Sequence, residues 1–472
     1  MSRALPEQPA EVFRRRHAAL RAELGDHSAL IFAGGYKPMN YPANIYPYRA
    51  DSHFLYLTGA ALPDASVLVS GERAELFLEP TPDDDALWHG EVESWDEIAA
   101  RIGVDAIRDV AELPDAIQAA GGPEKVGTLP STDPLTRIRQ SSALTRPWSA
   151  ADLSPALVGA DGAVADAMIA LRLVHDAAAI EKMREAARTT AEAHVVGMKV
   201  TRPGIFEHEV HGAMEAVLLA RGMRASYPPI VTVHGEVLHN THYHHQLRDG
   251  DLLLVDLGAD NMGWAGDVTR TWPVNGKYSP TQKAMYELVL QAEVDAIAMV
   301  RPGARYRDIH LAAARTLMQG FVDEGIFVGD VDGLVERGAH ALFFPHGTGH
   351  LIGLDVHDME DLGDRAGYAP GRTRSQQFGL CYLRLDRDLQ PGMAVTIEPG
   401  FYQVPAILDK EELVAPFVAD GSFKREALAK FADIRGIRIE DDVLCTDGEP
   451  EVLSAAIPKT VSDIEAVVGS GV

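Results

Sequence analysis

Two aspartates border a strand–turn–strand pattern in the middle of the chain. In the stretch LLLVDLGADNMGWAGDVTR, Asp256 follows one apolar run and Asp267 precedes the next. The pattern predicts strands over 252–255 and 266–271 with a turn over 260–263, which would place the two carboxylates directly opposite each other. Carboxylates at that separation repel each other unless a cation lies between them. The alternative is a pair of solvated charges on two strands.

Further acidic and imidazole groups lie on or beside short apolar strands downstream, where a charge is costly unless it is paired. They are His350, Glu398 and Glu440. With the two aspartates they make four carboxylates and one imidazole, and two divalent ions would balance this charge. Oxygen-rich ligation with a single nitrogen favours manganese, cobalt or iron over a structural zinc site. By themselves, Glu398 and Glu440 would more often be charges at strand ends.

A second group of histidines is another candidate for metal binding. It consists of His239, His242, His244 and His245. We interpret this stretch as a solvated loop with one functional histidine. The nearby run from His208 to His211 is one residue short of the helical zinc-protease spacing, so its histidines would not share a helix face, and we interpret them as surface residues.

Charge and composition exclude some classes of partner. The chain has 472 residues and a formal net charge of −26. Binding to a nucleic-acid backbone needs clustered Lys and Arg, so we expect no nucleic-acid partner. The apolar runs are shorter than a membrane span, so we expect no membrane association. Two cysteines, Cys381 and Cys445, and an N-terminus without a cleavable apolar segment favour a cytoplasmic setting with free thiols, although a disulfide between them would also fit.

Alternating helical and strand-like runs predict an α/β (α+β) protein. The strand-like runs of the first part are IFAGG, FLYLTG, ASVLVS and AELFLEP, and WDEIAARIG and LPDAIQAAG are helical. A turn-rich stretch over 146–162 follows them, so we place a domain boundary near residue 160. The predicted domains are therefore 1–160 and 161–472.

The second domain contains an internal repeat. RPGIFEHEVHGAMEAVL, which begins at Arg202, aligns without gaps with RPGARYRDIHLAAARTL, which begins at Arg301. Each copy follows a predicted helix, the first capped by Asp176 and the second opened by a capping box at Ser279. The repeat predicts two helix–helix–strand halves in one domain, with a site at the seam between them.

Four motifs carry a resemblance to a known family. VDLGADNMGWAGDVTRTWPVNG, HGTGHLIGLDVHD, TIEPGFY and GIRIEDDV, in this order and spacing, resemble the metal-site motifs of the proline-specific pita-bread metallopeptidases, aminopeptidase P and prolidase. YRADSHFLYLTG followed by LFLEP resembles the amino-terminal domain of aminopeptidase P. The resemblance spans most of the chain. It implies an N-terminal α/β domain followed by a pita-bread catalytic domain with duplicated halves, and a homodimer or tetramer.

The resemblance also implies roles for individual residues. Asp256 would bind one metal ion, Asp267 and Glu440 would bridge two, and His350 and Glu398 would hold the second. Manganese is the expected ion, with cobalt, zinc or iron as alternatives. Glu398 would also shuttle a proton. The other positions matched by the family contact substrate, stabilise the tetrahedral intermediate or border the site, and they are His239, His346, His357, Tyr402 and Arg438.

The activity implied by the resemblance is that of an Xaa-Pro aminopeptidase, which releases the N-terminal residue from peptides with proline in second position. The segment around 362–390, before Glu398, is more like that of prolidases of higher organisms, so hydrolysis of dipeptides alone is the alternative. Arg372, Arg374 or Arg384 would then bind the dipeptide carboxylate, although exposed loop arginines are the simpler interpretation. Less expected are a non-catalytic pita-bread binding protein and a creatinase-like amidinohydrolase, neither of which would hold metal at this site.

Overall fold

The structure is a computed structural model that divides into two compact units, Met1–Leu173 and Val174–Val472. The boundary predicted near residue 160 lies at the start of helix α7 (Gly159–Leu173), whereas the division follows this helix. The reason is that α7 packs on α1 (Ala10–Leu24) and on β5 (Val126–Gly127) of the first unit. The residues described are 8–82, 84–90, 93–146 and 157–471, so part of the turn-rich stretch that suggested the boundary lies outside them.

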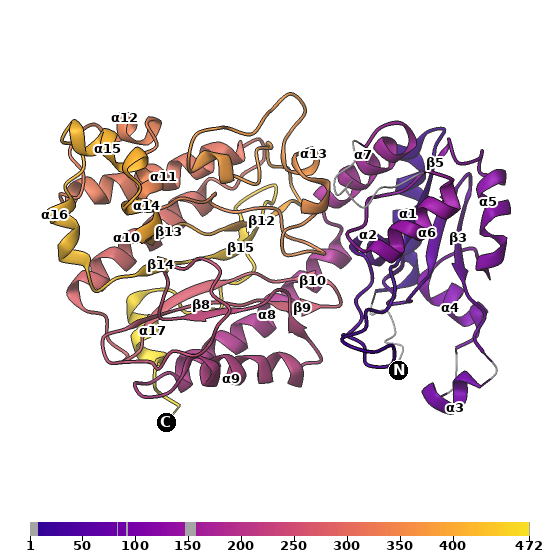
Figure 1. The fold of residues 1–472 in the computed structure, drawn as a ribbon, viewed down its shortest axis with the longest axis horizontal. Coiled ribbons are helices and arrows are strands. Elements are labelled where there is room, and N and C mark those ends of the chain that lie inside the picture. Colours follow the sequence, from indigo (N-terminus) through magenta and orange to yellow (C-terminus); the bar gives the residue numbers. More distant parts are fainter. Residues whose placement is uncertain (1–7, 83, 91–92, 147–156, 472) are drawn as a thin grey trace. The chain divides into compact units, whose positions relative to one another are not determined.

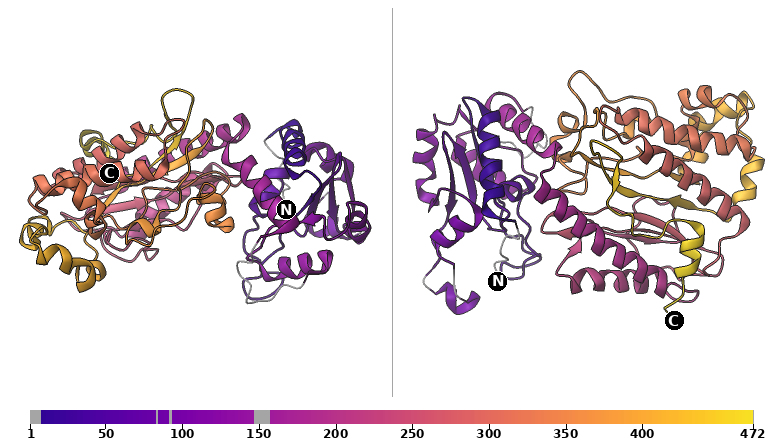
Figure 2. Two further views of the ribbon diagram at one scale, coloured as in Figure 1. Left: turned by 90° about the horizontal axis from the view of Figure 1, so that it is seen from above. Right: turned by 180° about the vertical axis from the view of Figure 1, so that it is seen from behind.

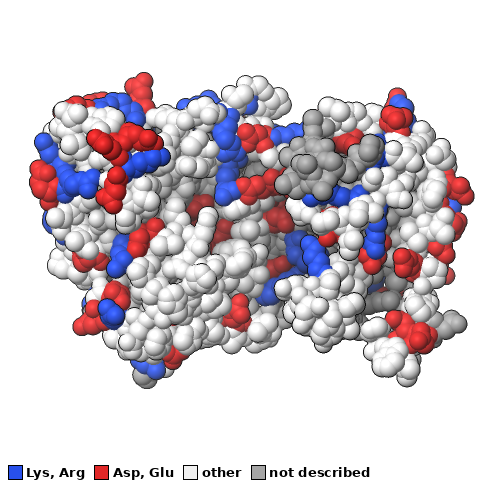
Figure 3. All heavy atoms as spheres, viewed as in Figure 1, with Lys and Arg blue, Asp and Glu red and all other residues white. Residues whose placement is uncertain are grey.

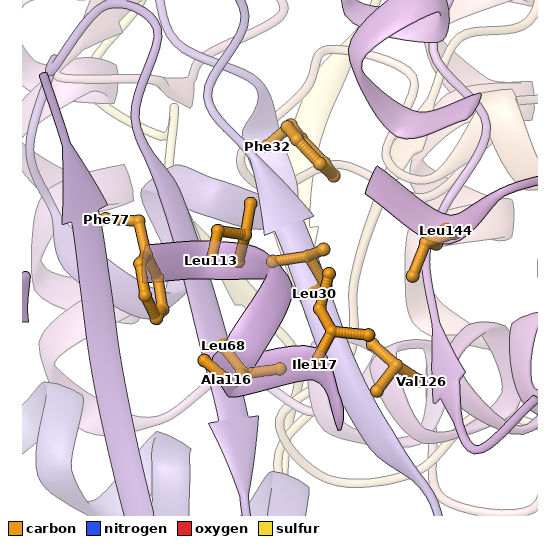
Figure 4. Close-up of a cluster of buried hydrophobic side chains, with 9 residues drawn as sticks. All are labelled: Leu30, Phe32, Leu68, Phe77, Leu113, Ala116, Ile117, Val126 and Leu144. Atoms are coloured by element: carbon orange, nitrogen blue, oxygen red, sulfur yellow. The ribbon is translucent and has the colours of Figure 1, made fainter. Parts of the chain in front are cut away.

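The first unit is built on a five-stranded sheet in the order β4-β3-β2-β1-β5. Its other strands are β1 (Ser28–Phe32), β2 (Ser66–Ser70), β3 (Arg73–Leu78) and β4 (Ala106–Asp109), and its other helices are α2 (Ser52–Thr58), α3 (Asp85–His89), α4 (Trp95–Ile102), η1 (Val110–Glu112), α5 (Leu113–Ala119) and α6 (Pro134–Leu144). Strands β1, β2 and β3 pair antiparallel, whereas β4 and β5 join the sheet in parallel. Figure 4 shows apolar side chains of β1, β2, β3 and β5 meeting those of α5 and α6.

One predicted strand of the first unit is a helix. The run FLYLTG forms most of α2, so the strand prediction for it is wrong. Asp51 caps this helix by accepting hydrogen bonds from the backbone N–H groups of His53 and Phe54, and Gly59 closes it in the left-handed conformation. A short apolar run is compatible with either structure, and here the residues on its two sides decide for the helix.

The second unit repeats one arrangement of paired helices. Helix α8 (Ala177–Val200) packs on α9 (Glu207–Ala220), and α10 (Pro280–Ala298) packs on α11 (Tyr306–Asp323). An Arg-Pro-Gly sequence separates the two helices of each pair, so the predicted duplication is confirmed. In Figures 1 and 2 the strands of this unit run between the two helix pairs.

Local capping decides where the first helix of each pair begins. The Asp176 carboxylate accepts a hydrogen bond from the backbone N–H of Ala179 at 2.8 Å. Ser279 and Gln282 form a reciprocal capping box, with Pro280 at the first helical position. Both predicted helix starts are confirmed, because a cap depends only on residues within one turn.

Strands of the second unit form small sheets. Those of the first half are β6 (Arg224–Ala225), β7 (Ile230–Thr232), β8 (Leu252–Asp256), β9 (Ala259–Asn261), β10 (Trp264–Ala265) and β11 (Thr269–Pro273). Those of the second half are β12 (Ala394–Ile397), β13 (Gly400–Tyr402), β14 (Gly436–Arg438), β15 (Asp441–Leu444) and β16 (Glu451–Val452). The remaining elements are α12 (Val331–Glu336), η2 (Ala339–Leu342), η3 (Glu360–Leu362), α13 (Asp364–Gly367), η4 (Leu380–Tyr382), α14 (Pro405–Leu408), α15 (Glu411–Ala419), α16 (Arg425–Leu428), η5 (Ala429–Phe431) and α17 (Val461–Val467).

The predicted hairpin exists, but its register differs from the prediction. Asp256 of β8 lies opposite Thr269, the first residue of β11, and not opposite Asp267, which comes two residues before this strand begins. The two turn residues are Met262 and Gly263, with φ angles of 56° and 97°. A two-residue turn with both φ angles positive favours glycine at its second position, which moves the turn centre one residue later than predicted.

The surface of the molecule mixes charges of both signs. Over the face drawn in Figure 3, acidic and basic side chains are interspersed, so that the net charge of −26 is not gathered there in one patch. Among the helices in the described part of the chain, none combines the length and the apolar character needed to cross a membrane.

Candidate metal centre

Three of the predicted metal ligands converge at the seam between the two halves of the second unit. One ligand atom each from Asp267, His350 and Glu440 lies within 4.8 Å of the other two, and all three residues are buried. The Nε2 atom of His350 is 3.3 Å from Oδ2 of Asp267. Asp267 comes from the first half and the other two residues from the second, so both halves are needed to form this group.

Backbone pairing sets the positions of His350 and Glu398. The segment that contains His350 runs beside β12, where the Thr396 N–H donates to the His350 carbonyl at 3.0 Å and the Glu398 N–H donates to the Thr348 carbonyl at 2.8 Å. Gly349 is required for this close approach, because a Cβ there would lie 2.2 Å from the Thr396 carbonyl oxygen. As a result, His350 Nε2 lies 3.7 Å from Glu398 Oε1.

One hydrogen-bond network fixes the carboxylates of Asp256 and Glu440. Arg438 donates from Nη2 to Asp256 Oδ2 at 2.6 Å, and the Tyr227 hydroxyl donates to Asp256 Oδ1 at 2.5 Å. Arg438 also donates from Nε to the Thr269 hydroxyl at 2.9 Å, and Thr269 in turn donates to Glu440 Oε2 at 2.6 Å. Each carboxylate is therefore held in one orientation by hydrogen bonds from the protein, and the donors Arg438 and Thr269 are themselves buried.

The carboxyl groups of this site are buried, and there is too little positive charge nearby to balance them. Burial, and then the neighbouring Asp256, raises the pKa of Asp267 to about 8. Burial likewise raises the pKa of Glu398 to about 7, and burial followed by Asp267 raises the pKa of Glu440 well above its usual value. The guanidinium of Arg438 cannot neutralise four carboxylates. Since oxygens and one imidazole nitrogen suit a divalent cation, the residues present fit a metal ion.

His346 has both ring nitrogens engaged inside the protein. Its Nδ1 lies 2.8 Å from the Gly347 carbonyl, to which it donates, and its Nε2 accepts from the Tyr402 hydroxyl at 2.9 Å. Tyr402 also accepts from Arg438 Nη1 at 3.1 Å. Burial, and then Arg438, lowers the pKa of His346 to about 3, so this ring is neutral at neutral pH. Tyr402 therefore connects His346 to Arg438, and His346 Nδ1 also lies 3.7 Å from Glu398 Oε2.

The two other predicted histidines lie in different surroundings. His357 donates from Nδ1 to Oε2 of Glu360 at 2.6 Å, and its ring centroid is 4.3 Å from that of His350. His239 is exposed. Only His357 is thus oriented by a carboxylate.

These residues surround a single cavity of about 790 Å³. Of the predicted site residues, those that line it are Asp256, Asp267, His350, Glu398, Glu440, His239, His346, His357 and Arg438. Tyr402 is fully buried behind this wall. Apolar side chains, including Ile230, Leu238 and Ile407, form another part of the lining. The cavity thus offers both a charged centre and an apolar wall to a ligand.

Tyr227, Thr269 and Glu360 are site residues that sequence reasoning missed. Thr269 had a usable signal, since alternation along a strand places it on the same face as Asp267. Tyr227 lies in a loop and Glu360 opens the short helix η3, and no periodic pattern in the sequence predicts the direction of either side chain. Their contacts with Asp256 and His357 follow from the tertiary structure alone.

The three arginines of the 362–390 segment have separate surroundings. Arg374 and Arg384 line the cavity. Arg372 instead pairs with Asp386 and Asp388. The structure therefore leaves two of the three arginines as candidates to meet a ligand in the cavity.

Of the second histidine group, His242, His244 and His245 are not among the residues that line the cavity. The rings of His244 and His245 are 4.1 Å apart, and Nδ1 of His245 lies 3.0 Å from an oxygen of the buried Glu207. In the described part of the chain, the group of three residues placed to share one metal ion is that of Asp267, not this one. Of the four histidines predicted in this loop, His239 is the one that lines the cavity.

A duplicated α/β unit that gathers carboxylates and one imidazole beside a deep cavity defines a metal-dependent hydrolase of the pita-bread class. Residues 181–447 match the model of metallopeptidase family M24, and residues 13–127 match that of the aminopeptidase P N-terminal domain. The chain belongs to metallopeptidase family M24, as the four motifs predict.

Relatives of both predicted activities are similar to this chain over nearly its whole length. The Xaa-Pro aminopeptidase of Escherichia coli is 30% identical over 486 residues, which cover 98% of this chain and 99% of the relative. The human Xaa-Pro dipeptidase is 31% identical over 451 residues, which cover 93% and 88%. The structure of Pseudomonas aeruginosa aminopeptidase PepP superposes with a TM-score of 0.79 at 31% identity and covers 99% of both chains.

Proposed function

We propose that this protein is an Xaa-Pro aminopeptidase, a metal-dependent exopeptidase that releases the N-terminal residue from peptides with proline in second position. The observation that carries the proposal is the convergence of Asp267, His350 and Glu440 in a cavity of about 790 Å³, within an M24 chain that also has an aminopeptidase P N-terminal domain. A cavity of this size accommodates a short peptide.

The metal site of this proposal holds two divalent ions, with manganese as the expected ion and cobalt, zinc or iron as alternatives. Asp256 would hold one ion, His350 and Glu398 the other, and Asp267 and Glu440 both. The large share of oxygen donors and the four carboxylates support this assignment. When bound, such ions polarise the scissile carbonyl and make a water molecule more acidic.

Glu398 is the residue suited to move a proton during hydrolysis. Its position in the cavity beside the other candidate ligands allows a side-chain oxygen to take a proton from the attacking water and to deliver it to the departing proline nitrogen. That nitrogen carries no hydrogen in the peptide, so it must gain one to leave as an amine. His357, whose Nδ1 is bound to Glu360, keeps its Nε2 for the substrate.

Proline selectivity is assigned to the apolar wall of the cavity. An Xaa-Pro bond offers no N–H for recognition, so a pocket must select the pyrrolidine ring by shape and apolar contact. Ile230, Leu238 and Ile407 provide such a surface next to the charged residues.

Hydrolysis of dipeptides alone is the second candidate function, and Arg384 is the observation that favours it. Its side chain lines the cavity that contains the candidate metal ligands, where it would meet the free carboxylate of an Xaa-Pro dipeptide. A longer peptide has no charge at that position. Arg384 would therefore contribute more to the binding of a dipeptide than to the binding of a longer peptide.

Hydrolysis of matched peptides by purified protein tests the proposal. The protein is treated with chelator, resupplied with manganese and given Ala-Pro, Ala-Pro-Ala and longer peptides that begin with Ala-Pro. Metal-dependent release of alanine from the longer peptides is the expected result. Cleavage of Ala-Pro alone would establish the dipeptidase, and absence of cleavage with every metal would contradict both.

We further propose that the protein is a cytoplasmic homodimer or homotetramer. The free Cys381 and Cys445 support a reducing compartment, and the family resemblance supports self-association. Light scattering after size-exclusion chromatography measures the mass directly, and a monomer of 51.1 kDa would contradict the proposal.

A further inference from the structure

One carboxylate joins two groups that the proposed function uses separately. Glu360, the first residue of η3, accepts a hydrogen bond from Nδ1 of His357 through Oε2 at 2.6 Å. Its other oxygen, Oε1, accepts from Nη1 of Arg384. All three side chains line the cavity. Glu360 is therefore the one side chain that connects Arg384 to His357 in this chain of hydrogen bonds.

The backbone around Glu360 is shaped to turn this side chain back toward His357. Met359 adopts a left-handed conformation with φ of 58°, and the Glu360 N–H donates to the His357 carbonyl at 3.2 Å. A left-handed conformation is unfavourable for a residue with a Cβ and persists where the surroundings enforce it. The Met359 side chain is buried, which anchors the turn. The position of Glu360 is thus set by the fold.

The ion pair between Glu360 and Arg384 is of a kind that a ligand can exchange. Their side chains are 48% and 37% exposed. Ion pairs with this degree of exposure are partly screened by solvent and contribute little net stability. An incoming carboxylate can therefore replace Glu360 at the guanidinium of Arg384.

Arg374, the other arginine of the cavity wall, is held differently. Its Nη1 donates to the carbonyl oxygens of Cys381 and Leu383, at 3.1 and 2.7 Å, and it forms an ion pair with Asp364. These bonds hold the loop that contains it. Arg374 is thus a structural residue, whereas among the described contacts the guanidinium of Arg384 pairs with one exchangeable carboxylate, that of Glu360.

We propose that Glu360 is a specificity-determining residue that lowers the preference for free dipeptides, and that it also positions His357. This inference rests on the proposed Xaa-Pro peptidase function. The carboxylate of a dipeptide must compete with Glu360 for Arg384, whereas a peptide that continues beyond proline presents a neutral amide and leaves the pair between Glu360 and Arg384 intact. Glu360 therefore favours longer peptides, because for them the hydrogen bond that orients His357 stays in place.

Two substrates that differ only in one charge test this assignment. Ala-Pro carries the free carboxylate and Ala-Pro-amide does not, so the ratio of their kcat/KM values measures recognition of the carboxylate. Glu360→Gln keeps the shape of the side chain and removes its charge. We expect this ratio to rise about three- to fivefold, the range for loss of a half-exposed ionic competitor. We also expect kcat to fall by about tenfold on both substrates, because His357 loses a hydrogen bond to a charged group.

Further variants separate the two roles of Glu360. Arg384→Gln should lower the ratio, and adding Glu360→Gln to it should leave the ratio unchanged while kcat still falls. Asp364→Asn is the matched control, since it removes the carboxylate partner of Arg374 on the same loop and should leave the ratio as in the wild type. Thermal unfolding of each variant shows whether it folds.

The possible results separate this assignment from the proposed function. If the wild type hydrolyses both substrates but Glu360→Gln leaves the ratio unchanged, the assignment alone is overturned. It is also overturned if Glu360→Gln raises the ratio equally in the absence of Arg384. A wild-type protein that hydrolyses neither substrate contradicts the proposed function, and the assignment with it.

Discussion

Strands β11 and β15, with the residues just before them, separate two buried clusters of charge, and the two clusters differ in how their charges are balanced. On the face away from the cavity, Arg270 Nη2 donates to Asp441 Oδ1 at 2.7 Å, and both side chains are fully buried. Lys459 lies 2.6 Å from Asp441 and 2.9 Å from Glu293. Two cations thus meet two carboxyl groups, and this cluster needs no further ion.

The cavity face has the opposite balance. Asp267 is three residues before Arg270 and Glu440 is next to Asp441, yet here the carboxylates outnumber the cations. Burial raises the pKa of Asp267 to about 8. At Asp441 burial acts in the same direction, but Arg270 and Lys459 outweigh it and hold the pKa well below its usual value. A buried cluster that balances itself holds the fold together, whereas one that does not is suited to bind a cation.

Burial also affects the fourth member of the balanced cluster. Burial, and then the nearness of Asp441, raises the pKa of Glu293. Since the pKa of Asp441 is lowered and that of Glu293 raised, Asp441 carries the charge and Glu293 takes up a proton first on acidification. Removing one carboxylate from each face should therefore have different effects on metal binding and on the free energy of unfolding.

The largest expected effect is that of Asp267→Asn on hydrolysis. Loss of this carboxylate should lower kcat/KM by about a thousandfold or more, a size comparable to loss of a central charge-stabilising group. The metal-free variant should be at least as stable as the wild type, because one buried carboxyl group is removed from a cluster in which carboxyl groups outnumber cations. Steady-state kinetics with manganese and urea unfolding of the metal-free proteins measure both. Turnover retained by the metal-loaded variant would refute the assignment of Asp267.

Asp441→Asn, on the other face, should destabilise the fold and leave metal binding almost unchanged. Removing it leaves Arg270 buried without its carboxylate, so the free energy of unfolding should fall by about 3 to 5 kcal/mol. Manganese affinity of the folded protein should stay close to that of the wild type. Urea unfolding and manganese titration check the two parts. If Asp441→Asn weakened manganese binding more than it destabilised the fold, the comparison of the two faces would fail.

The cavity face should also exchange protons for metal. In the metal-free protein Asp267 and Glu398, with pKa values of about 8 and about 7, hold protons at neutral pH. Because these values are raised above those of the unfolded chain, their contribution to stability is present at low pH and is lost as pH rises through about 7 to 8. Metal displaces the same protons, so manganese affinity should rise with pH over this range.

Calorimetry in two buffers of different ionisation enthalpy counts these protons. Manganese binding should release about one to two protons at about pH 6.5 and close to none at about pH 9. Asp267→Asn should release fewer, whereas a variant of the balanced face such as Asp441→Asn should release as many as the wild type. Equal release at both pH values would contradict the raised pKa values.

The smallest expected effect is that of Thr269→Val. Thr269 accepts from Arg438 and donates to Glu440, so its hydroxyl orients two residues of the site without lining the cavity. Its loss should weaken manganese binding by about tenfold, the lower end for groups that orient a ligand. Thr271→Val is the matched control, because the Thr271 hydroxyl bonds only to the backbone of Arg438 among its described contacts. Equal affinity in the two variants would show that Thr269 has no special role.

The sequence alone determined the features that depend on neighbouring residues. Asp176 and Ser279 mark helix starts correctly because a cap involves a single turn. Alternation along the predicted strand over 266–271 places Asp267 and Thr269 on one face and Arg270 on the other, although β11 itself begins only at Thr269. The motifs around the ligands were sufficient to identify the family. The run FLYLTG shows the limit, because a short apolar run does not by itself distinguish strand from helix.

Only the tertiary structure decided which side chains meet. The centre of the hairpin turn lies one residue later than the sequence predicted, and as a result Thr269, not Asp267, lies opposite Asp256. The bond between Arg438 and Asp256 joins residues from different halves, and that between Glu360 and Arg384 joins the start of η3 to a loop. Such contacts depend on packing between segments far apart in the chain, which local propensity does not determine. For the same reason, the sequence showed which charges are present, while the fold decided which of them are balanced.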